Sequence, residues 1–243
     1  MCSKSIRTLA FAALFGVAAA HSANAATSIN YGNFNVAGVV FGNVTESSGT
    51  DAVPLYGAPT TFVTGLDFNP AGFVAFSSGG GADITDGQLN FTVSRATGIG
   101  SISLAEAGDY TLVGSGTAAT LASAGANIAI KILEIDGVAV TPFSISGNNA
   151  SASYNLLANP GIVQPWAIGV STNILTQLAN YNPRIGATKI EVVIDNSLIA
   201  ISQPSSVASI SKKDFTVSIP VPEPTSLTAG LAFMGLMIRR RLK

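Results

Sequence analysis

The sequence contains a single cysteine and a single histidine, Cys2 and His21, and both lie in its N-terminal segment. We expect that segment to be removed, which leaves the mature chain with neither residue. Such a chain forms no disulfide, and its stability in an oxidising compartment depends on its core alone. It also lacks a cysteine nucleophile, a histidine general base and the usual ligands of zinc, copper and haem. Only enzymes that use carboxylate, lysine, serine or tyrosine chemistry are compatible with this composition.

Charged residues are also scarce, at 10% of the chain. Between Ala26 and Val221, six Lys and Arg residues stand against twelve Asp and Glu residues, which gives a formal charge of about −6. Nucleic acids are bound by clustered lysine and arginine, which this segment lacks. We therefore expect no nucleic-acid partner.

The N-terminal segment has the three parts of a secretory signal peptide. Lys4 and Arg7 come first, a run of small apolar residues follows at 9–20, and Ala23-Asn24-Ala25 ends it. A positive region, an apolar region and an A-x-A site in this order predict export and cleavage. We expect a signal peptide helix at residues 1–25, cut after Ala25, with Ala26 as the first residue of the mature chain.

The C-terminal segment, residues 221–243, has its basic residues after an apolar run, whereas the N-terminal segment has them before one. Pro222-Glu223-Pro224 cannot form regular helix or central strand, because proline fixes φ and has no N–H to donate. The predominantly apolar residues 225–238 follow, and we expect them to form a short transmembrane helix. A basic tail closes the chain at residues 239–243, where a membrane segment would have its cytoplasmic end. The tail consists of Arg239, Arg240, Arg241, Leu242 and Lys243.

This order of motif, apolar segment and basic tail resembles the C-terminal sorting signal of PEP-CTERM proteins. The resemblance covers residues 221–243 and the signal peptide, and it implies processing near Pro222-Glu223-Pro224 by exosortase, a membrane-embedded cysteine protease. Family members come from Gram-negative bacteria, many of which make extracellular polysaccharide. The resemblance implies an exported protein of the cell envelope or extracellular matrix that is anchored transiently in the membrane. Its implied partners are exosortase and the export machinery.

The segment between these ends, residues 26–220, has the alternation of apolar and polar residues that is typical of β-strands. Four stretches show it, with Leu89/Phe91/Val93, Ile128/Ile130/Ile132, Ile190/Val192/Ile194 and Phe215/Val217/Ile219 as the apolar sets. We predict one all-β domain, a two-sheet jelly-roll-like β-sandwich, with one short helix at residues 173–180.

Clusters of Gly, Asp, Asn and Ser predict the turns between strands. We expect turns at residues 77–81, 86–87, 107–109, 136–137, 146–149 and 195–196. Asp136-Gly137 predicts a tight type I′ hairpin, because this dipeptide readily adopts two positive φ values.

Several residues have a possible functional role beside a structural one. Asp83 and Asp86 could hold a structural calcium ion or stabilise an Asp-rich turn. Trp166, Tyr154 and Tyr181 could stack on a sugar ring or pack in the core. No other metal site or cofactor is indicated.

Charged residues near the predicted turns and strand ends also leave two interpretations open. Glu106 and Asp109 bracket Ala107-Gly108 and, like Asp83 and Asp86, could hold calcium or stabilise a hairpin turn, which we favour. Lys212-Lys213-Asp214, expected at the start of the last strand, could bind an acidic polymer or protect a sheet edge from aggregation.

Two classes of function remain. The first is a non-catalytic surface or matrix protein that is associated with extracellular polysaccharide, and we favour it. The alternative is a carbohydrate-active protein, either a glycosidase with two facing carboxylates or a carbohydrate-binding module with exposed aromatic residues. We assign no catalytic residue.

Overall fold

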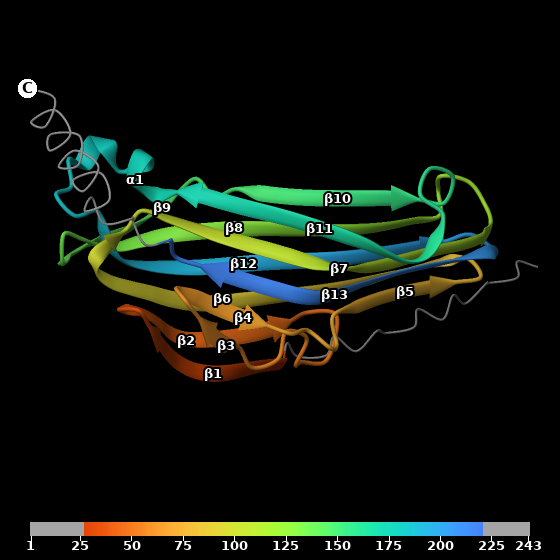
Figure 1. The fold of residues 1–243 in the computed structure, drawn as a ribbon, viewed down its shortest axis with the longest axis horizontal. Coiled ribbons are helices and arrows are strands. Elements are labelled where there is room, and N and C mark those ends of the chain that lie inside the picture. Colours follow the sequence, from red (N-terminus) through yellow and green to blue (C-terminus); the bar gives the residue numbers. More distant parts are fainter. Residues whose placement is uncertain (1–26, 221–243) are drawn as a thin grey trace, which may run out of the picture.

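The computed structural model describes residues 27–220, an elongated molecule made almost entirely of β-strands (Figure 1). The predicted signal peptide helix and transmembrane helix lie outside these residues. Within residues 27–220 two antiparallel sheets pack face to face, which confirms the predicted all-β sandwich.

The large sheet has seven strands among the described residues, in the order β1-β2-β6-β12-β8-β10, with β9 also paired to β8. Its strands are β1 (Thr27–Val36), β2 (Val39–Ser48), β6 (Gly81–Ile99), β8 (Leu121–Ile135), β9 (Val138–Ile145), β10 (Asn149–Asn155) and β12 (Ala187–Ser202).

The small sheet has six strands in the described part of the chain, in the order β11-β7-β13-β4-β3, with β5 also paired to β13. They are β3 (Thr60–Phe62), β4 (Gly65–Phe68), β5 (Val74–Ser78), β7 (Ser101–Ser115), β11 (Gly161–Asn173) and β13 (Ser205–Ser218). In Figure 1, β7 and β13 lie in front of β12 and β6.

The chain passes between the sheets at several short connections. Gly100 alone separates β6 from β7, and Gln203-Pro204 separates β12 from β13. Because β6 pairs with β12 and β7 pairs with β13, the same two long chain segments form the centre of both layers.

The inner faces carry the predicted apolar sets. Leu89, Phe91 and Val93 of β6 are buried, as are the corresponding residues of β8, β12 and β13 and Ile219 directly after β13. Tyr56, Phe68, Phe73 and Phe215 form an aromatic cluster between the sheets, with ring centroids 5.1–6.0 Å apart. Large aromatic side chains bury the most apolar surface per residue, so this cluster is a main source of cohesion between the layers.

Several predicted local features are confirmed. Asp136 and Gly137 have φ values of 54° and 79° and close the β8–β9 hairpin. A short helix, α1 (Ile174–Gln177), and a 3-10 turn (Ala179–Tyr181) occupy the predicted helical segment. Asn173 caps α1 by accepting a hydrogen bond from the Thr176 N–H. In the part of the chain that is described, no helix combines the length and apolar character needed to span a bilayer.

Three predicted turns are wrong, because residues 86–87, 107–109 and 195–196 lie inside β6, β7 and β12. Gly87 and Gly108 serve close packing instead of a turn. A Cβ on Gly87 would lie 2.7 Å from the Phe73 ring, and one on Gly108 would lie 1.9 Å from the Ser211 carbonyl oxygen. Each glycine is therefore required by its neighbours across the core or the sheet.

Lys212-Lys213-Asp214 does not begin the last strand, as predicted, but lies within β13 at an irregularity in its pairing with β7. The irregularity falls between Lys212 and Asp214, and it leaves Lys212 buried while Lys213 and Asp214 are exposed.

Candidate functional site

The outer face of the large sheet carries many polar side chains that the alternating pattern leaves outside the core. On β12 the outward residues are Glu191, Val193, Asp195 and Ser197, and their cross-strand neighbours on β6 and β8 are also outward. We call this surface the polar face; its members are Asp86, Gln88, Asn90, Thr92, Gly125, Asn127, Ala129, Lys131, Glu191, Val193, Asp195 and Ser197.

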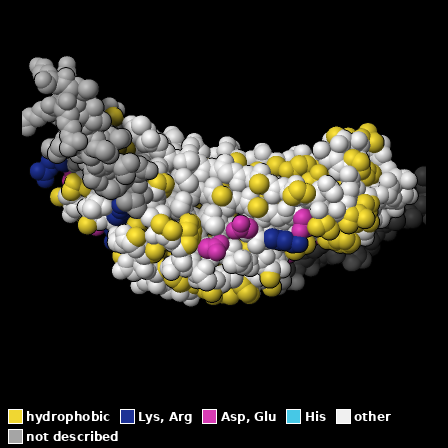
Figure 2. Space-filling view, in the orientation of Figure 1, with side chains coloured by type: hydrophobic (Ala, Val, Ile, Leu, Met, Phe, Trp, Pro, Cys, Tyr) yellow, Lys and Arg dark blue, Asp and Glu magenta, His cyan; other side chains and the backbone are white. Residues whose placement is uncertain are grey.

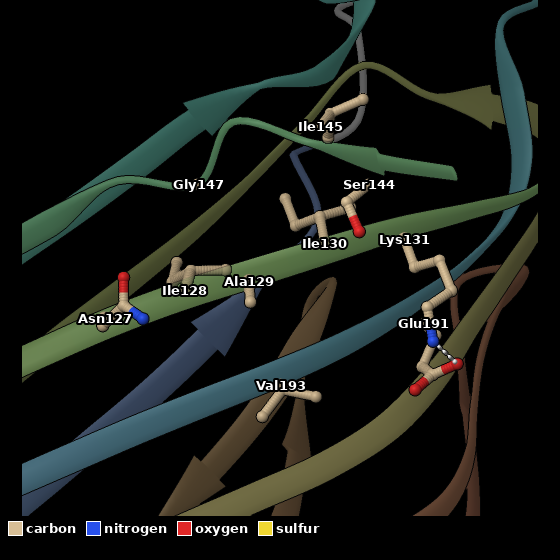
Figure 3. Close-up of a pocket in the computed structure, with 10 residues that line it drawn as sticks. All are labelled: Asn127, Ile128, Ala129, Ile130, Lys131, Ser144, Ile145, Gly147, Glu191 and Val193. Atoms are coloured by element: carbon tan, nitrogen blue, oxygen red, sulfur yellow. Dashed lines mark hydrogen bonds and ion pairs between the residues drawn. The ribbon is translucent and has the colours of Figure 1, made fainter. Parts of the chain in front are cut away.

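A hollow of about 310 Å³ opens on the polar face where β9 leaves β8 and β10 joins it (Figure 3). The chain connecting the two strands lies close to β8 at Gly147, where a Cβ would be 1.6 Å from the Ile128 carbonyl oxygen. Glycine is therefore needed for this approach, and the approach forms one wall of the hollow.

Lys131 and Glu191 form an ion pair at one end of this hollow, with 3.2 Å between Nζ and Oε2, and Asn127 lies at the other (Figure 3). The side chains of Lys131 and Glu191 are 43% and 30% exposed, so both charges remain accessible to a ligand. Ser144 of β9 supplies a hydroxyl on the adjoining wall.

A second hollow, of about 280 Å³, adjoins the first and shares Asn127 with it. Asp86 and Asp195 line it, and Gln88 Nε2 donates a 2.6 Å hydrogen bond to Asp195 Oδ1. Burial raises the pKa of Asp86, and the negative charges of Asp195 and Asp51 raise it further. The remaining lining consists of small and amide residues: Gly125, Ala126, Asn149, Ala150, Ser151, Asn196 and Ser197.

The two hollows together present carboxylates, amides, hydroxyls and one ammonium over a continuous part of the sheet. Carboxylates accept hydrogen bonds and amides both donate and accept, so these groups complement a ligand rich in hydroxyls. The residues that line the two hollows include no aromatic side chain, so a ligand here would be held by hydrogen bonds.

The opposite side of the sandwich differs in chemistry. Figure 2 looks onto the small sheet, where few charged side chains are visible and hydrophobic side chains gather toward one end. Exposed apolar residues on this side include Val74 and Phe76 of β5 and Ile162 and Val163 of β11.

Of the three aromatic residues singled out from the sequence, Tyr181 alone is exposed, so they do not form a row of exposed rings. Trp166 is 3% exposed and its Nε1–H donates to the Ser211 carbonyl oxygen at 3.0 Å, so it packs in the core. Tyr154 stacks on Tyr110 with centroids 4.1 Å apart, and Tyr181 stacks on Phe143 at 4.9 Å.

The proposed calcium pair is separated by the strand. Asp83 and Asp86 lie three residues apart on β6, and successive side chains of a strand point to opposite faces. Asp83 Oδ2 accepts a hydrogen bond from the Phe76 N–H, whereas Asp86 belongs to the polar face. Within residues 27–220 no group of three or more acidic, histidine or cysteine side chains could hold a metal ion.

The positions predicted for the other charged residues also differ from those in the structure. Glu106 and Asp109 lie inside β7 rather than at a hairpin turn, and Glu106 is buried against Lys212. Lys212 is therefore no surface handle for an acidic polymer. Lys213 is exposed and pairs with Asp109.

Residues 1–26 and 221–243 lie outside the described part of the chain. This includes the cleavage-site residues Ala23, Ala25 and Ala26, the motif Pro222-Glu223-Pro224, and the basic residues Arg239, Arg240, Arg241 and Lys243. Their roles remain predictions from the sequence.

The polar face is not recognisable as a site in the sequence. Asn127, Lys131 and Glu191 were visible only as the polar half of an alternating strand pattern. Asp86 and Asp195 were assigned to turns because Gly87 and Asn196 follow them. A polar set repeated on several strands was the available signal, but which strands are neighbours is decided by pairing that the sequence does not show.

No protein-family model and no curated protein matches this chain. Among solved structures, it is similar to TmCBM61 in complex with β-1,4-galactotriose, with 12% identity, a TM-score of 0.22, and 80% of this chain and 88% of that chain covered. It is similar to the xylan-binding module CBM15, with 14% identity, a TM-score of 0.24 and coverage of 80% and 97%. A third is the enzymatically active domain of bacteriophage CBA120 tailspike protein 4, with 14% identity, a TM-score of 0.19 and coverage of 78% and 19%. TM-scores this low do not bear on function.

Proposed function

We propose that this chain is an exported, non-catalytic protein of the cell surface or extracellular matrix that binds extracellular polysaccharide through its polar face. The observation that carries the proposal is the pair of adjoining hollows, lined by carboxylate, amide, hydroxyl and ammonium groups and open to solvent. A polysaccharide is long enough to occupy both hollows together.

The sheet arranges these groups as a regular grid. Neighbouring strands lie about 4.8 Å apart, and side chains on one face repeat about every 6.8 Å along a strand. A chain of sugar hydroxyls laid across β6, β12 and β8 therefore meets several donors and acceptors together. Each hydrogen bond contributes only about 0.5–1.5 kcal/mol, so affinity requires many of them.

We also propose that the C-terminal segment directs sorting, with exosortase processing near Pro222-Glu223-Pro224 and transient membrane anchoring by residues 225–238. The position of the motif favours this. Arg95 Nη1 donates a hydrogen bond to the Pro220 carbonyl oxygen at 3.2 Å. The Ile219 N–H donates one to the Thr64 carbonyl oxygen at 3.1 Å. The chain is thus held by the domain up to two residues before the motif.

Replacing Arg239, Arg240 and Arg241 together with glutamine should weaken retention in the membrane before cleavage, because the basic tail would hold the cytoplasmic end. Membrane fractionation with detection of the uncleaved form measures this. Sorting and processing like the wild type would show that the arginines have no stop-transfer role.

A second candidate function, a two-carboxylate glycosidase, is favoured by one observation. Asp86 lies opposite Ser197, and Asp195 lies two residues from Ser197 on β12, so the two aspartates are diagonal neighbours on one face. The backbone positions of diagonal neighbours lie about 7–8 Å apart, which allows their carboxyl groups to adopt the separation of about 6.5–9.5 Å found in inverting glycosidases. The raised pKa of Asp86 suits a general acid.

The two functions are separated by incubating the purified chain with the host's extracellular polysaccharide and following co-sedimentation and polymer length. We expect binding without shortening, and weaker binding by the double variant Asn127→Ala/Asp195→Ala. The matched control is Asp214→Ala, which removes an exposed carboxylate from the small sheet. Shortening that disappears in Asp86→Asn would identify the protein as a glycosidase, and unchanged binding by the double variant would exclude the polar face.

We also propose that the sandwich is jelly-roll-like. The chain crosses between the two layers at Gly100 and at Gln203-Pro204, which supports this topology.

A further inference from the structure

Four polar side chains are buried together between the sheets, beside the aromatic cluster. Lys212 of β13 is 1% exposed, Glu106 of β7 is 2% exposed, Asn196 of β12 is 1% exposed, and Tyr56 is fully buried. Buried polar groups are normally fully hydrogen-bonded, and buried charges are costly even when they are paired. Asn196 also borders the second hollow, but its side chain is buried, and Lys212, Glu106 and Tyr56 line neither hollow.

The Glu106 carboxylate lies between the lysine and the asparagine. Its Oε2 atom is 2.7 Å from Lys212 Nζ, and its Oε1 atom accepts a hydrogen bond from Asn196 Nδ2. The amine of Lys212 and the carboxamide of Asn196 are therefore held on the two oxygens of one carboxylate. Apart from each other, Lys212 Nζ and Glu106 Oε2 have no hydrogen-bond partner among the described residues.

Tyr56 holds the other end of the Asn196 side chain. Its hydroxyl is placed to donate to Asn196 Oδ1 at 2.7 Å, with the Gly87 carbonyl oxygen 2.9 Å away as the other acceptor. Burial and the surrounding carboxylates raise the pKa of Tyr56, so the hydroxyl keeps its proton. A proton donor on Oδ1 draws electrons from the amide carbon and stabilises negative charge that develops on the oxygen.

The protonation states of the ion pair shift toward neutrality. Burial lowers the pKa of Lys212 to about 8, although Glu106 beside it acts in the opposite direction. Burial likewise raises the pKa of Glu106, against the effects of Lys212 and Asn196. The Lys212 Nζ also lies 4.5 Å, 5.0 Å and 5.4 Å from the ring centroids of Phe73, Phe215 and Tyr56, which exclude water. A neutral amine is a nucleophile, whereas an ammonium is not.

We propose that Lys212 and Asn196 form an intramolecular amide bond, with Glu106 as the proton carrier and Tyr56 as the donor to the carbonyl oxygen. Lys212 Nζ attacks Asn196 Cγ, and Glu106 takes a proton from Nζ. Tyr56 stabilises the oxygen of the tetrahedral intermediate. Glu106 then passes the proton to Nδ2, the Cγ–Nδ2 bond breaks, and ammonia leaves. One C–N bond is formed and one is broken, and no oxidant or cofactor is needed.

The bond would join β12 of the large sheet to β13 of the small sheet. It would therefore link the two layers of the sandwich covalently in a domain without cysteine. This inference does not depend on the proposed polysaccharide binding, and either can fail without the other.

The experiment is mass spectrometry of tryptic peptides from the purified full chain. Trypsin cuts after Lys189, Lys212 and Lys213, so Asn196 and Lys212 fall within residues 190–213. We expect a peptide of residues 190–213 that lacks one ammonia and is uncut after Lys212. Further cleavage with chymotrypsin after Leu198 should leave its two parts joined through the side chains.

Three other outcomes would overturn the proposal or its mechanism. Unmodified peptides that end at Lys212 would exclude the bond. Loss of ammonia with Lys212 still cleavable would indicate a cyclic imide at Asn196 instead. The variant Glu106→Gln should contain no linked peptide, and a linked peptide in it would exclude Glu106 as the proton carrier. The matched control Lys213→Arg, which keeps a tryptic site, should retain the link. If Glu106→Gln does not fold, the wild-type peptide alone decides.

Discussion

Two lysine–glutamate pairs, one inside the sandwich and one on its surface, have opposite environments. Lys212 and Glu106 are 2.7 Å apart and both side chains are 0% exposed. Lys131 and Glu191 are 3.2 Å apart, with side chains 43% and 30% exposed. Water screens the outer pair and leaves both its groups available to a ligand. Burial of the inner pair makes its charges costly and lowers the pKa of the Lys212 amine.

The largest expected effect is on stability, from removing one partner of the inner pair. Glu106→Ala should lower the free energy of unfolding by about 3–5 kcal/mol, because Lys212 would be left buried without a partner. The matching change in the outer pair, Glu191→Ala, should cost about 0–1 kcal/mol. Urea denaturation followed by circular dichroism measures both. Equal losses would mean that burial does not distinguish the pairs.

The next prediction separates charge burial from covalent linkage. Replacing both inner partners with apolar residues, in Lys212→Met/Glu106→Leu, removes the buried charges and is often neutral or stabilising. It also removes the proposed cross-link, which would cost about 3 kcal/mol for a loop of this length by analogy with disulfides. We expect the double variant to unfold at lower urea concentration than the wild type. A double variant as stable as the wild type would contradict a stabilising cross-link.

A smaller effect is expected at the outer pair when ligand is present. Glu191→Ala should reduce polysaccharide affinity about twofold to tenfold, the equivalent of one lost hydrogen bond of about 0.5–1.5 kcal/mol. Affinity electrophoresis in gels containing the polysaccharide measures this change. Lys213→Ala, which removes an exposed charge from the small sheet, is the control. If both variants lose affinity equally, binding is non-specific attraction between charges.

The smallest expected effect is a change of pKa within the second hollow. Asp195→Asn should lower the pKa of Asp86, because the Asp195 charge contributes to raising it. A raised folded-state pKa means that the stability contributed by Asp86 is complete below its unfolded pKa and is lost as pH rises through the folded value. The variant should therefore lose less stability over that pH range. NMR titration of the carboxyl carbon follows the pKa, and an unchanged value would show that the two aspartates are not coupled.

The fold class and the inner faces could be predicted from the sequence because burial on one side of a strand imposes a two-residue period. Leu89, Phe91 and Val93 follow that period without exception. Turns predicted from local composition were wrong where packing between distant residues overrides the local preference. Gly87 and Gly108 resemble turn residues, yet they are needed because Phe73 and the Ser211 backbone lie against them.

The candidate sites could not be predicted, because both depend on strand pairing. Asp195 lies beside Asn127 and Gln88 only through the pairing of β12 with β8 and β6. Lys212, Glu106 and Asn196 come from three strands in two sheets, and Lys212 stands in a charged tripeptide that suggests an exposed position. A short-range pattern carries no information about such long-range contacts.

The most direct test of the polar face is residue-level mapping of ligand contacts. A soluble oligosaccharide fraction of the polysaccharide is titrated into isotope-labelled protein, and backbone amide shifts are followed by NMR. We predict that the shifts concentrate on β6, β8 and β12 around Asn127, Glu191 and Asp195, with little change on the small sheet. Shifts centred instead on β5, β11 and β13 would contradict the assignment of the polar face as the binding surface.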